Sequence, residues 1–356
     1  MSRPAGKTIL IMAGGTGGHI FPALAVATEL RDAGWKVLWL GNPGSMEARL
    51  VPQHGFEMVY VRFGALRGKG IWRKLLLPLN LLRGFAQALG ELRRIRPDVV
   101  LGMGGYVTFP GGMMASLLGI PLVIHEQNSV PGLANRVLAR VADKVLTGFP
   151  EVMKKGIWVG NPVREDIVRV APPAERLAGR DGPFNLLVVG GSLGAQALNE
   201  IIPKGLALME PALRPHVVHQ SGEKHLASLE RHYREAGVKA HCVSFIDDMA
   251  GAYAWADLVI CRAGALTVAE LAAVGVPAIL VPYPHAVDDH QTGNARFLTL
   301  AGGAFLLPQA ELTPEAVALI GNYSRHQLRE MAEKARALAK PDAARAVAQV
   351  CREIAK

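Results

Sequence analysis

The chain has 356 residues, of which 50% are hydrophobic and 19% are charged. At about 100–200 residues per domain, this length predicts two domains that each bury a core, and the composition excludes an intrinsically disordered protein. Three widely spaced cysteines give neither a disulfide framework nor a CxxC metal pair, so we expect a reducing compartment and no structural zinc or iron–sulfur site. The short polar N-terminus carries no signal segment, which predicts a cytoplasmic location.

Short runs rich in Val, Ile and Leu alternate with longer Ala-, Leu- and charge-rich segments along the whole chain. This alternation predicts β-α-β units with parallel sheets. The predicted strands are Thr8–Met12, Lys36–Leu40, Asp98–Leu101, Leu122–His125, Leu186–Val189, Leu258–Ile260 and Ala278–Val281.

A glycine cluster, GGTGGH at 14–19, follows the first strand and opens a predicted helix that has Pro22 at an early position and ends before Gly34. Such a turn either packs helix on strand or offers free N–H groups to a phosphate or a substrate oxygen. His19 ends the cluster at its rim. It is either an ordinary surface histidine or a general base or oxyanion-side donor, and its spacing to other histidines matches no zinc motif.

The positive charge is concentrated in one segment. Nine basic residues and one acid between Arg62 and Arg96 contribute +8 of the net +9. Within it, an apolar run at 71–83 has cations on both flanks and is shorter than the about 20 residues that span a bilayer. It is either a buried helix with a solvated basic rim or a patch that docks on anionic lipids. We favour the patch over nucleic-acid binding, because no nucleic-acid motif accompanies it. Its members are Trp72, Arg73, Lys74, Leu75, Leu76, Leu79, Leu82 and Arg83.

A second glycine cluster, GGSLGA at 190–195, begins 176 residues after the first. The spacing predicts two similar Rossmann-like halves, linked through 160–164 and a Pro- and charge-rich loop at 169–183. Ligands of open α/β sheets bind at the carboxyl edges of the strands, so we expect a cleft between the two edges. Neither cluster fits GxGxxG, which disfavours a dinucleotide cofactor.

The second cluster also fits GxSxG, the nucleophile elbow of serine hydrolases. A hydrolase would use Ser192 with Asp247 or Asp257 and with His285 or His290. We disfavour it, because Ser192 is the counterpart of Thr16, a hydroxyl in a predicted phosphate cradle.

The segment CRAGALTVAE at 261–270 places Gly264 to Thr267 at a helix start after a strand. Glu270 is either a surface acid on a capped helix or a fixed carboxylate for both hydroxyls of a ribose, with the helix N-terminus holding a diphosphate. Arg164 could then neutralise a leaving diphosphate. The chain has no Asp-x-Asp, so we expect no required metal.

Seven motifs occur together in order, and they cover nearly the whole chain: GGTGGHIFP (14–22), GMGGYV (102–107), HEQN (125–128), GNPVR (160–164), GGSLGA (190–195), FIDDM (245–249) and RAGALT (262–267). Together they resemble the MurG family, the bacterial N-acetylglucosaminyltransferases that complete the lipid-linked peptidoglycan disaccharide. The resemblance implies a GT-B fold with two Rossmann-like domains. Residues 1–160 would form the acceptor and membrane-side domain and 161–340 the UDP-sugar domain, and the helix at 341–356 would return to the first.

The resemblance also implies the substrates and the site. The donor would be UDP-N-acetylglucosamine and the acceptor undecaprenyl-diphosphoryl-N-acetylmuramoyl-pentapeptide, with no cofactor. The enzyme would be peripheral on the cytoplasmic face of the inner membrane, with anionic lipids and a cell-wall synthesis complex as partners. Thr16, Gly17, Gly18 and Asn128 would lie on the sugar and acceptor side. Arg164 and Ser192 would hold diphosphate, Ile246 would meet uracil through its backbone, and Ala265, Leu266, Thr267, Val268, Ala269 and Glu270 would bind phosphate and ribose.

The family has a glutamine-rich stretch for the sugar hydroxyls, whereas HAVDDHQ at 285–291 holds a single Gln. We assign the sugar contact to Gln291, and Asp289 or His290 could share it. The expected reaction is one inverting displacement with His19 or a neighbour as base. Two further alternatives stay open: a UDP-sugar epimerase, which needs no basic apolar patch, and a non-catalytic membrane adaptor, which needs no UDP-sugar site.

Overall fold

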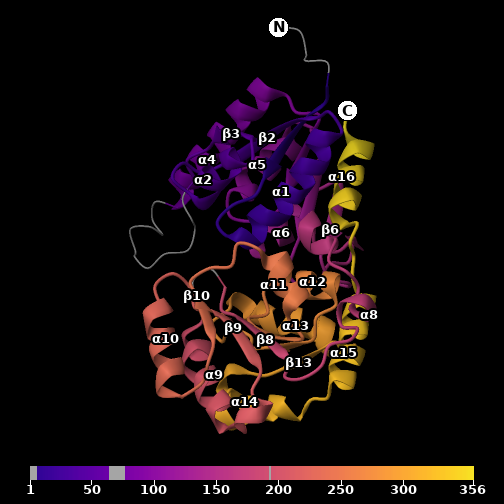
Figure 1. Cartoon of the computed structure of the whole chain (residues 1–356). Helices are drawn as coiled ribbons and strands as arrows, with labels where there is room; N and C mark the ends of the chain where they lie inside the picture. The colour runs from indigo at the N-terminus through magenta and orange to yellow at the C-terminus, as the bar shows by residue number, and fades with distance from the viewer. Residues whose placement is uncertain (1–5, 64–76, 192–193) are drawn as a thin grey trace. The chain divides into compact units, whose positions relative to one another are not determined.

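The computed structural model describes residues 6–63, 77–191 and 194–356, and it divides the chain into two compact units (Figure 1). The first unit contains Met1–Arg164 and Pro341–Lys356, and the second contains Glu165–Lys340. The boundary therefore falls within the segment that the sequence marks as a link.

The first unit is built on a seven-stranded parallel sheet with the order β3-β2-β1-β4-β5-β6-β7. The central strand β1 is fully buried, because helices cover both faces of a parallel sheet. The strands are β1 (Thr8–Met12), β2 (Lys36–Gly41), β3 (Glu57–Tyr60), β4 (Val99–Gly102), β5 (Leu122–Glu126), β6 (Lys144–Thr147) and β7 (Gly156–Trp158).

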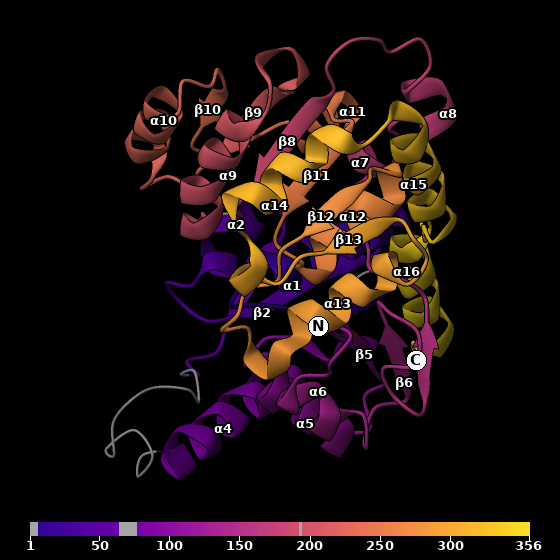
Figure 2. The same cartoon turned by 90° about the horizontal axis from the view of Figure 1, so that it is seen from below.

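Two groups of helices cover this sheet. On one face α1 (Gly17–Asp32) and the C-terminal helix α16 (Ala343–Ile354) pack together, and Val347 and Cys351 of α16 join the same core as Ile9 and Ile20. On the other face α4 (Leu77–Ile95), α5 (Thr108–Leu117) and α6 (Leu133–Leu138) lie side by side (Figure 2). The helix α2 (Met46–Gln53) follows β2.

The second unit has a six-stranded parallel sheet with the order β10-β9-β8-β11-β12-β13. Its strands are β8 (Asn185–Val189), β9 (His216–Gln220), β10 (His241–Val243), β11 (Leu258–Cys261), β12 (Ala278–Leu280) and β13 (Ala304–Leu306). Its helices of seven or more residues are α9 (Gln196–Leu208), α10 (Leu226–Glu235), α11 (Met249–Trp255), α12 (Ala265–Val274), α13 (His290–Thr299) and α15 (Arg325–Ala337). The shorter α-helices are α7 (Glu165–Val168), α8 (Pro173–Arg176) and α14 (Pro314–Ala318).

In each sheet the first strand of the unit, β1 or β8, lies between the second strand, β2 or β9, and the fourth strand, β4 or β11. This strand order is typical of doubly wound Rossmann-like domains, so the predicted fold of each half is confirmed. Across the described ranges 6–63, 77–191 and 194–356, no helix has the length and apolar character that a membrane crossing requires.

Candidate active site

Three loops meet at the carboxyl edge of the first sheet, after the neighbouring strands β1, β4 and β5. The N–H of Gly14 donates to the carbonyl of Gly104 over 3.3 Å, and the side chain of Gln127 donates to the carbonyl of Met103 over 2.9 Å. Five predicted residues belong to the first and third of these loops or to the helix start after the first loop. They are Thr16, Gly17, Gly18, His19 and Asn128. The fold thus brings the predicted acceptor-side residues to one edge.

His19 lies in the first turn of α1 and is half-buried. Its Nδ1 is 3.1 Å from the carbonyl oxygen of Gly14 and 3.3 Å from the hydroxyl of Thr16. The ring also packs on Gly104, where a side-chain Cβ would come within 2.6 Å of the ring carbon Cδ2. Gly104, with φ of +93°, is therefore needed both for its backbone conformation and for the space it leaves to His19.

Asn128 is held by Glu126, a buried residue that the sequence analysis did not assign. One carboxylate oxygen of Glu126 accepts the N–H of Asn128 over 3.0 Å, and the other accepts the N–H of Gly132 over 3.0 Å and the side chain of Asn135 over 2.9 Å. An acid directly after an apolar strand, inside the HEQN motif, is the signal that could have revealed it. Its carboxylate fixes the loop from Asn128 to Gly132.

His125 joins this loop to the segment before Arg164. Its Nε2 donates to the carbonyl of Gly160 over 2.9 Å, and its Nδ1 accepts from Gln127 over 3.2 Å. Burial lowers the pKa of His125 to about 4, although the Gly160 bond and the negative charge of Glu126 act in the opposite direction. The ring is therefore neutral at pH 7, and its role is structural, because it holds the loop after β5 to the chain at Gly160. Arg164 ends the first unit and is half-buried.

The second glycine cluster follows β8 and leads into α9. Gln220 at the end of β9 fixes it, because its side chain accepts the N–H of Gly191 over 3.1 Å and donates to the Gly191 carbonyl over 3.0 Å. Ser192, predicted to hold diphosphate, lies outside the described residues, as does Leu193. Gln220 is a further residue that sequence reasoning missed, since it stands apart from the motif it supports.

Helix α12 contains the residues predicted for phosphate and ribose. Gly264 caps it, Ala265 begins it, and Leu266 and Thr267 are half-buried in its first turn. Glu270 is only 8% exposed and accepts the hydroxyl of Tyr253 over 3.1 Å. The alternative that Glu270 is a surface acid is therefore wrong. Val268 is buried and Ala269 half-buried on the same helix.

Ile246 and Gln291 also lie at the carboxyl edge of the second sheet. Ile246 is half-buried in the loop after β10, and Gln291 lies in the first turn of α13, where its side chain accepts the N–H of Tyr283 over 2.9 Å. Asp289, just before the helix, has a left-handed backbone with φ of +49° and accepts the hydroxyl of Thr292 over 2.7 Å. Each predicted donor-side residue that the structure describes in the second unit thus belongs to one edge of one sheet.

Asp257, an acid candidate for the hydrolase alternative, lies elsewhere. It precedes β11 at the amino edge of the sheet and is 2% exposed. Its carboxylate pairs with Arg180 over 2.6 Å and with Arg325 over 3.2 Å. Asp257 therefore stabilises the fold, at the opposite edge from the glycine cluster.

The predicted membrane patch is partly described. Trp72, Arg73, Lys74, Leu75 and Leu76 lie outside the described residues. On α4, Leu79 is 64% and Leu82 is 65% exposed, and Arg83 beside them is also exposed. The opposite side of the helix buries Ala88 and Leu92 against the sheet. Leu79 and Leu82 do not pack in the core, and this favours a membrane patch over the alternative of a buried helix.

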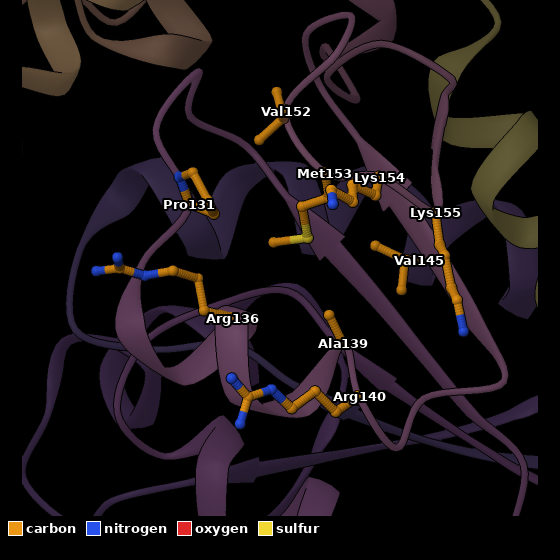
Figure 3. Close-up of a pocket in the computed structure, with 9 residues that line it drawn as sticks. All are labelled: Pro131, Arg136, Ala139, Arg140, Val145, Val152, Met153, Lys154 and Lys155. Carbon is orange, nitrogen blue, oxygen red and sulfur yellow. The ribbon is translucent and has the colours of Figure 1, made fainter.

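The first unit contains a pocket of about 410 Å³ (Figure 3). One of its lining residues is Pro131, three residues after Asn128. Val145 and Met153 give it apolar walls, and the surrounding cations are Arg136, Arg140, Lys154 and Lys155. A second pocket, of about 760 Å³, lies near the amino ends of β9 and β10. Neither is lined by a predicted site residue. In the part of the chain that the structure describes, no three His, Cys, Asp or Glu side chains are close enough to hold a metal ion.

Comparison with known proteins gives consistent matches over both units. Residues 9–147 match the glycosyltransferase family 28 N-terminal domain, and residues 185–350 match the glycosyltransferase family 28 C-terminal domain. A UDP-N-acetylglucosamine–N-acetylmuramyl-(pentapeptide) pyrophosphoryl-undecaprenol N-acetylglucosamine transferase from Dechloromonas aromatica (strain RCB) is 73% identical over 350 residues, which cover 98% of this chain and 99% of that protein. A protein of the same description from Aromatoleum aromaticum is 69% identical over 350 residues, with 98% of each chain covered.

Solved glycosyltransferase structures also match nearly the whole chain. The crystal structure of MurG from Acinetobacter baumannii is 42% identical, with a TM-score of 0.86 over 98% of this chain and 99% of that chain. A calicheamicin glycosyltransferase has a TM-score of 0.67 over 99% of this chain and 98% of that chain at 16% identity, a likeness that concerns the fold alone.

Proposed function

The chain belongs to glycosyltransferase family 28, and from this membership we propose that it transfers N-acetylglucosamine from UDP-N-acetylglucosamine to undecaprenyl-diphosphoryl-N-acetylmuramoyl-pentapeptide (lipid I). The sugar is added to the 4-hydroxyl of N-acetylmuramic acid and gives lipid II for peptidoglycan synthesis. The observation that carries this proposal is the 73% identity, over nearly the whole length of both chains, to a relative whose name states this donor and this acceptor.

The second unit provides the donor site. The N-terminus of α12 offers free N–H groups and a positive dipole end to the diphosphate. Glu270, buried five residues further along α12, accepts the ribose hydroxyls, and the backbone of Ile246 meets uracil. Gln291 contacts the sugar hydroxyls, and the neighbouring Asp289 and His290 are available to share that role. Arg164 and Ser192 hold the diphosphate as it leaves.

The first unit provides the acceptor site and the base. Thr16, Gly17, Gly18 and Asn128 line the acceptor side of the site. The reaction is a single displacement: the 4-hydroxyl oxygen attacks C1 of N-acetylglucosamine, the bond from C1 to the diphosphate breaks, and His19 takes the hydroxyl proton. The developing charge on UDP is stabilised by the α12 terminus and by Arg164.

The membrane patch on and before α4 docks the enzyme on anionic lipids at the cytoplasmic face of the inner membrane, where its lipid-linked acceptor is anchored. The exposed Leu79, Leu82 and Arg83 support this docking. A cell-wall synthesis complex is the expected protein partner.

The direct test is mass-spectrometric detection of N-acetylhexosamine transfer from UDP-N-acetylglucosamine to a short-chain lipid I analogue. A chelator is present, and a matched reaction lacks acceptor. We expect the disaccharide product with chelator and no new UDP-sugar without acceptor. A new UDP-sugar in the acceptor-free reaction, with no disaccharide, would instead identify an epimerase.

A further inference from the structure

A buried carboxylate lies directly behind the first glycine cluster. Glu47 is the second residue of α2, and its side chain is fully buried. A buried carboxylate is costly unless its oxygens accept hydrogen bonds. One oxygen of Glu47 accepts the N–H of Gly15 over 3.1 Å, and the other accepts the N–H of Asn42 over 3.2 Å. The carboxylate therefore ties the loop after β1 to the loop after β2.

The N–H of Gly15 and the carbonyl of Gly14 belong to one planar peptide group. Glu47 binds this group at its N–H, and the Nδ1 of His19 lies 3.1 Å from its carbonyl oxygen. A carbonyl oxygen can only accept a hydrogen bond, so the bond to Gly14 requires the proton on Nδ1, and the Thr16 hydroxyl, 3.3 Å from the same nitrogen, can accept as well as donate. In the neutral ring Nε2 is then the unprotonated nitrogen, as a general base requires.

The packing around this peptide group leaves little freedom. A Cβ on Gly14 would lie 2.7 Å from a carboxylate oxygen of Glu47, and a Cβ on Gly105 would collide with the Gly14 carbonyl. Gly15 has φ of +88°, which turns the peptide so that its two ends face Glu47 and His19. The glycines of this cluster are thus explained by the packing of the Glu47 carboxylate against the loop as well as by the proposed substrate contact.

We propose that Glu47 is a positioning residue for His19, acting through the peptide group between Gly14 and Gly15. This inference rests on the proposed role of His19 as the base. The anionic carboxylate polarises the peptide group, so that the Gly14 carbonyl becomes a stronger acceptor for Nδ1–H. When the acceptor hydroxyl loses its proton to Nε2, Nδ1 keeps its own, and the polarised carbonyl stabilises the imidazolium that forms.

The first test is Glu47→Gln, which keeps the size of the side chain and removes its charge and one of its two acceptor oxygens. We expect kcat to fall about tenfold, a part of the 10²–10⁴ that a general base contributes, with an unchanged KM for UDP-N-acetylglucosamine. The matched control is Glu57→Gln, because Glu57 is an exposed carboxylate of the same unit. An unchanged kcat in folded Glu47→Gln would overturn the proposal.

A double-mutant cycle separates this role from a general loss of structure. In the His19→Ala background, Glu47→Gln should change kcat by less than about twofold, because the group it acts on is gone. The same loss in both backgrounds would contradict the proposal and leave His19 as the base. A kcat unchanged by His19→Ala would instead contradict the proposed function of His19.

A spectroscopic measurement needs no variant. The ¹⁵N chemical shifts of the His19 ring in the full, unliganded chain should show the tautomer with the proton on Nδ1. A ring protonated mainly on Nε2 would overturn the proposal even if Glu47→Gln failed to fold.

Discussion

Glu270 is buried, and its carboxylate accepts the hydroxyl of Tyr253. The proposed ribose contact uses its remaining acceptor capacity. We expect Glu270→Ala to weaken UDP binding by about tenfold or more, since a hydrogen bond to a charged group contributes about 1.5–3 kcal/mol. Isothermal titration with UDP measures this.

The matched control is Glu333→Ala, because Glu333 is an exposed acid on α15 of the same unit. Equal UDP affinity in Glu270→Ala and the wild type would remove Glu270 from the donor site. Stability is measured in parallel, because the Tyr253 hydroxyl loses its acceptor in this variant.

Two buried histidines predict how stability depends on pH. Burial lowers the pKa of His125 to about 4 and the pKa of His219 to about 3, whereas an unfolded histidine titrates near 6.5. Below pH 6.5 the unfolded chain therefore binds more protons, and the free energy of unfolding falls as pH drops. The expected slope is about 1.4 kcal/mol per pH unit for each histidine between pH 6 and the folded value.

Urea unfolding at several pH values measures this slope. Replacing His219 by Gln should reduce it by about half, because one of the two histidines is removed. His216→Gln, an exposed neighbour on the same strand, should leave it unchanged. A wild-type stability that is flat between pH 4 and 6 would contradict the assignment of both rings as neutral.

Some site residues follow from the sequence and others do not. His19, Asn128, Glu270 and Gln291 stand in or beside motifs at strand ends, where parallel topology gathers ligand-binding groups. Glu47 and Glu126 support those motifs from behind. Glu47 accepts the N–H groups of Gly15 and Asn42, in the loops after β1 and β2, and no pattern in a single sequence encodes such a pairing. Glu126 accepts the N–H groups of Asn128 and Gly132 in its own loop, and its place inside the HEQN motif is a signal in the sequence.

The helix α4 is two-sided, because it packs Ala88 and Leu92 inward while Leu79 and Leu82 are exposed. Burying an exposed leucine in a lipid interface is worth about 1.5–3 kcal/mol. The double substitution Leu79→Ser with Leu82→Ser should therefore reduce binding to anionic vesicles by at least about tenfold, with little change in thermal stability.

Vesicle sedimentation at fixed salt measures this, and Leu300→Ser, at an exposed leucine of the second unit, is the control. The charge-reversed variant with Arg73, Lys74 and Arg83 replaced by Glu tests the basic members of the patch. Undiminished vesicle binding in both variants would refute the membrane patch.

At the scale of elements, the sequence predicts strands best where they are buried on both faces. The first strand is found at Thr8–Met12 as predicted. The other predicted strands differ by one residue at one end, except β4, which is shifted by one residue at both ends. The missed strands include β3, β7 and β10, which are short and carry exposed residues. They pair at or near sheet edges, where burial leaves a weaker hydrophobic pattern. Pro22 lies in the second turn of α1, since the helix begins at Gly17.

At the scale of the whole molecule, the first unit is completed by the C-terminal end of the chain. Val347, Ala348 and Cys351 of α16 are buried against α1. Ending the chain at Lys340 removes these groups and exposes the apolar side of α1. Each buried side chain that is lost costs about 1 kcal/mol or more, so we expect the free energy of unfolding of the first unit to fall by several kcal/mol.

Calorimetry with two resolvable transitions measures this effect. The transition of the first unit should move to lower temperature while that of the second stays in place. Arg345→Ala, at an exposed position of the same helix, should change neither. Identical transitions in the truncated and full chains would contradict the contribution of α16 to the first unit.

The two-domain GT-B fold and the transferase class were predictable from the sequence and are confirmed by the two parallel sheets and the family membership. The glycine clusters after equivalent strands carry most of that information, because they recur in both halves. The boundary at Arg164 instead depends on long-range packing: His125 and Gln127 bind the chain at Gly160 and Asn161 and so hold this segment to the first unit.

The proposed reaction is an inverting transfer of N-acetylglucosamine to the 4-hydroxyl of the lipid-linked acceptor. The most direct measurement is NMR of the product made from UDP-N-acetylglucosamine with a ¹³C-labelled sugar and a short-chain lipid I analogue. We expect a β-configured C1 on the transferred sugar, correlated through the glycosidic oxygen to C4 of N-acetylmuramic acid. An α-linked sugar, a bond to another hydroxyl, or no labelled disaccharide would contradict it.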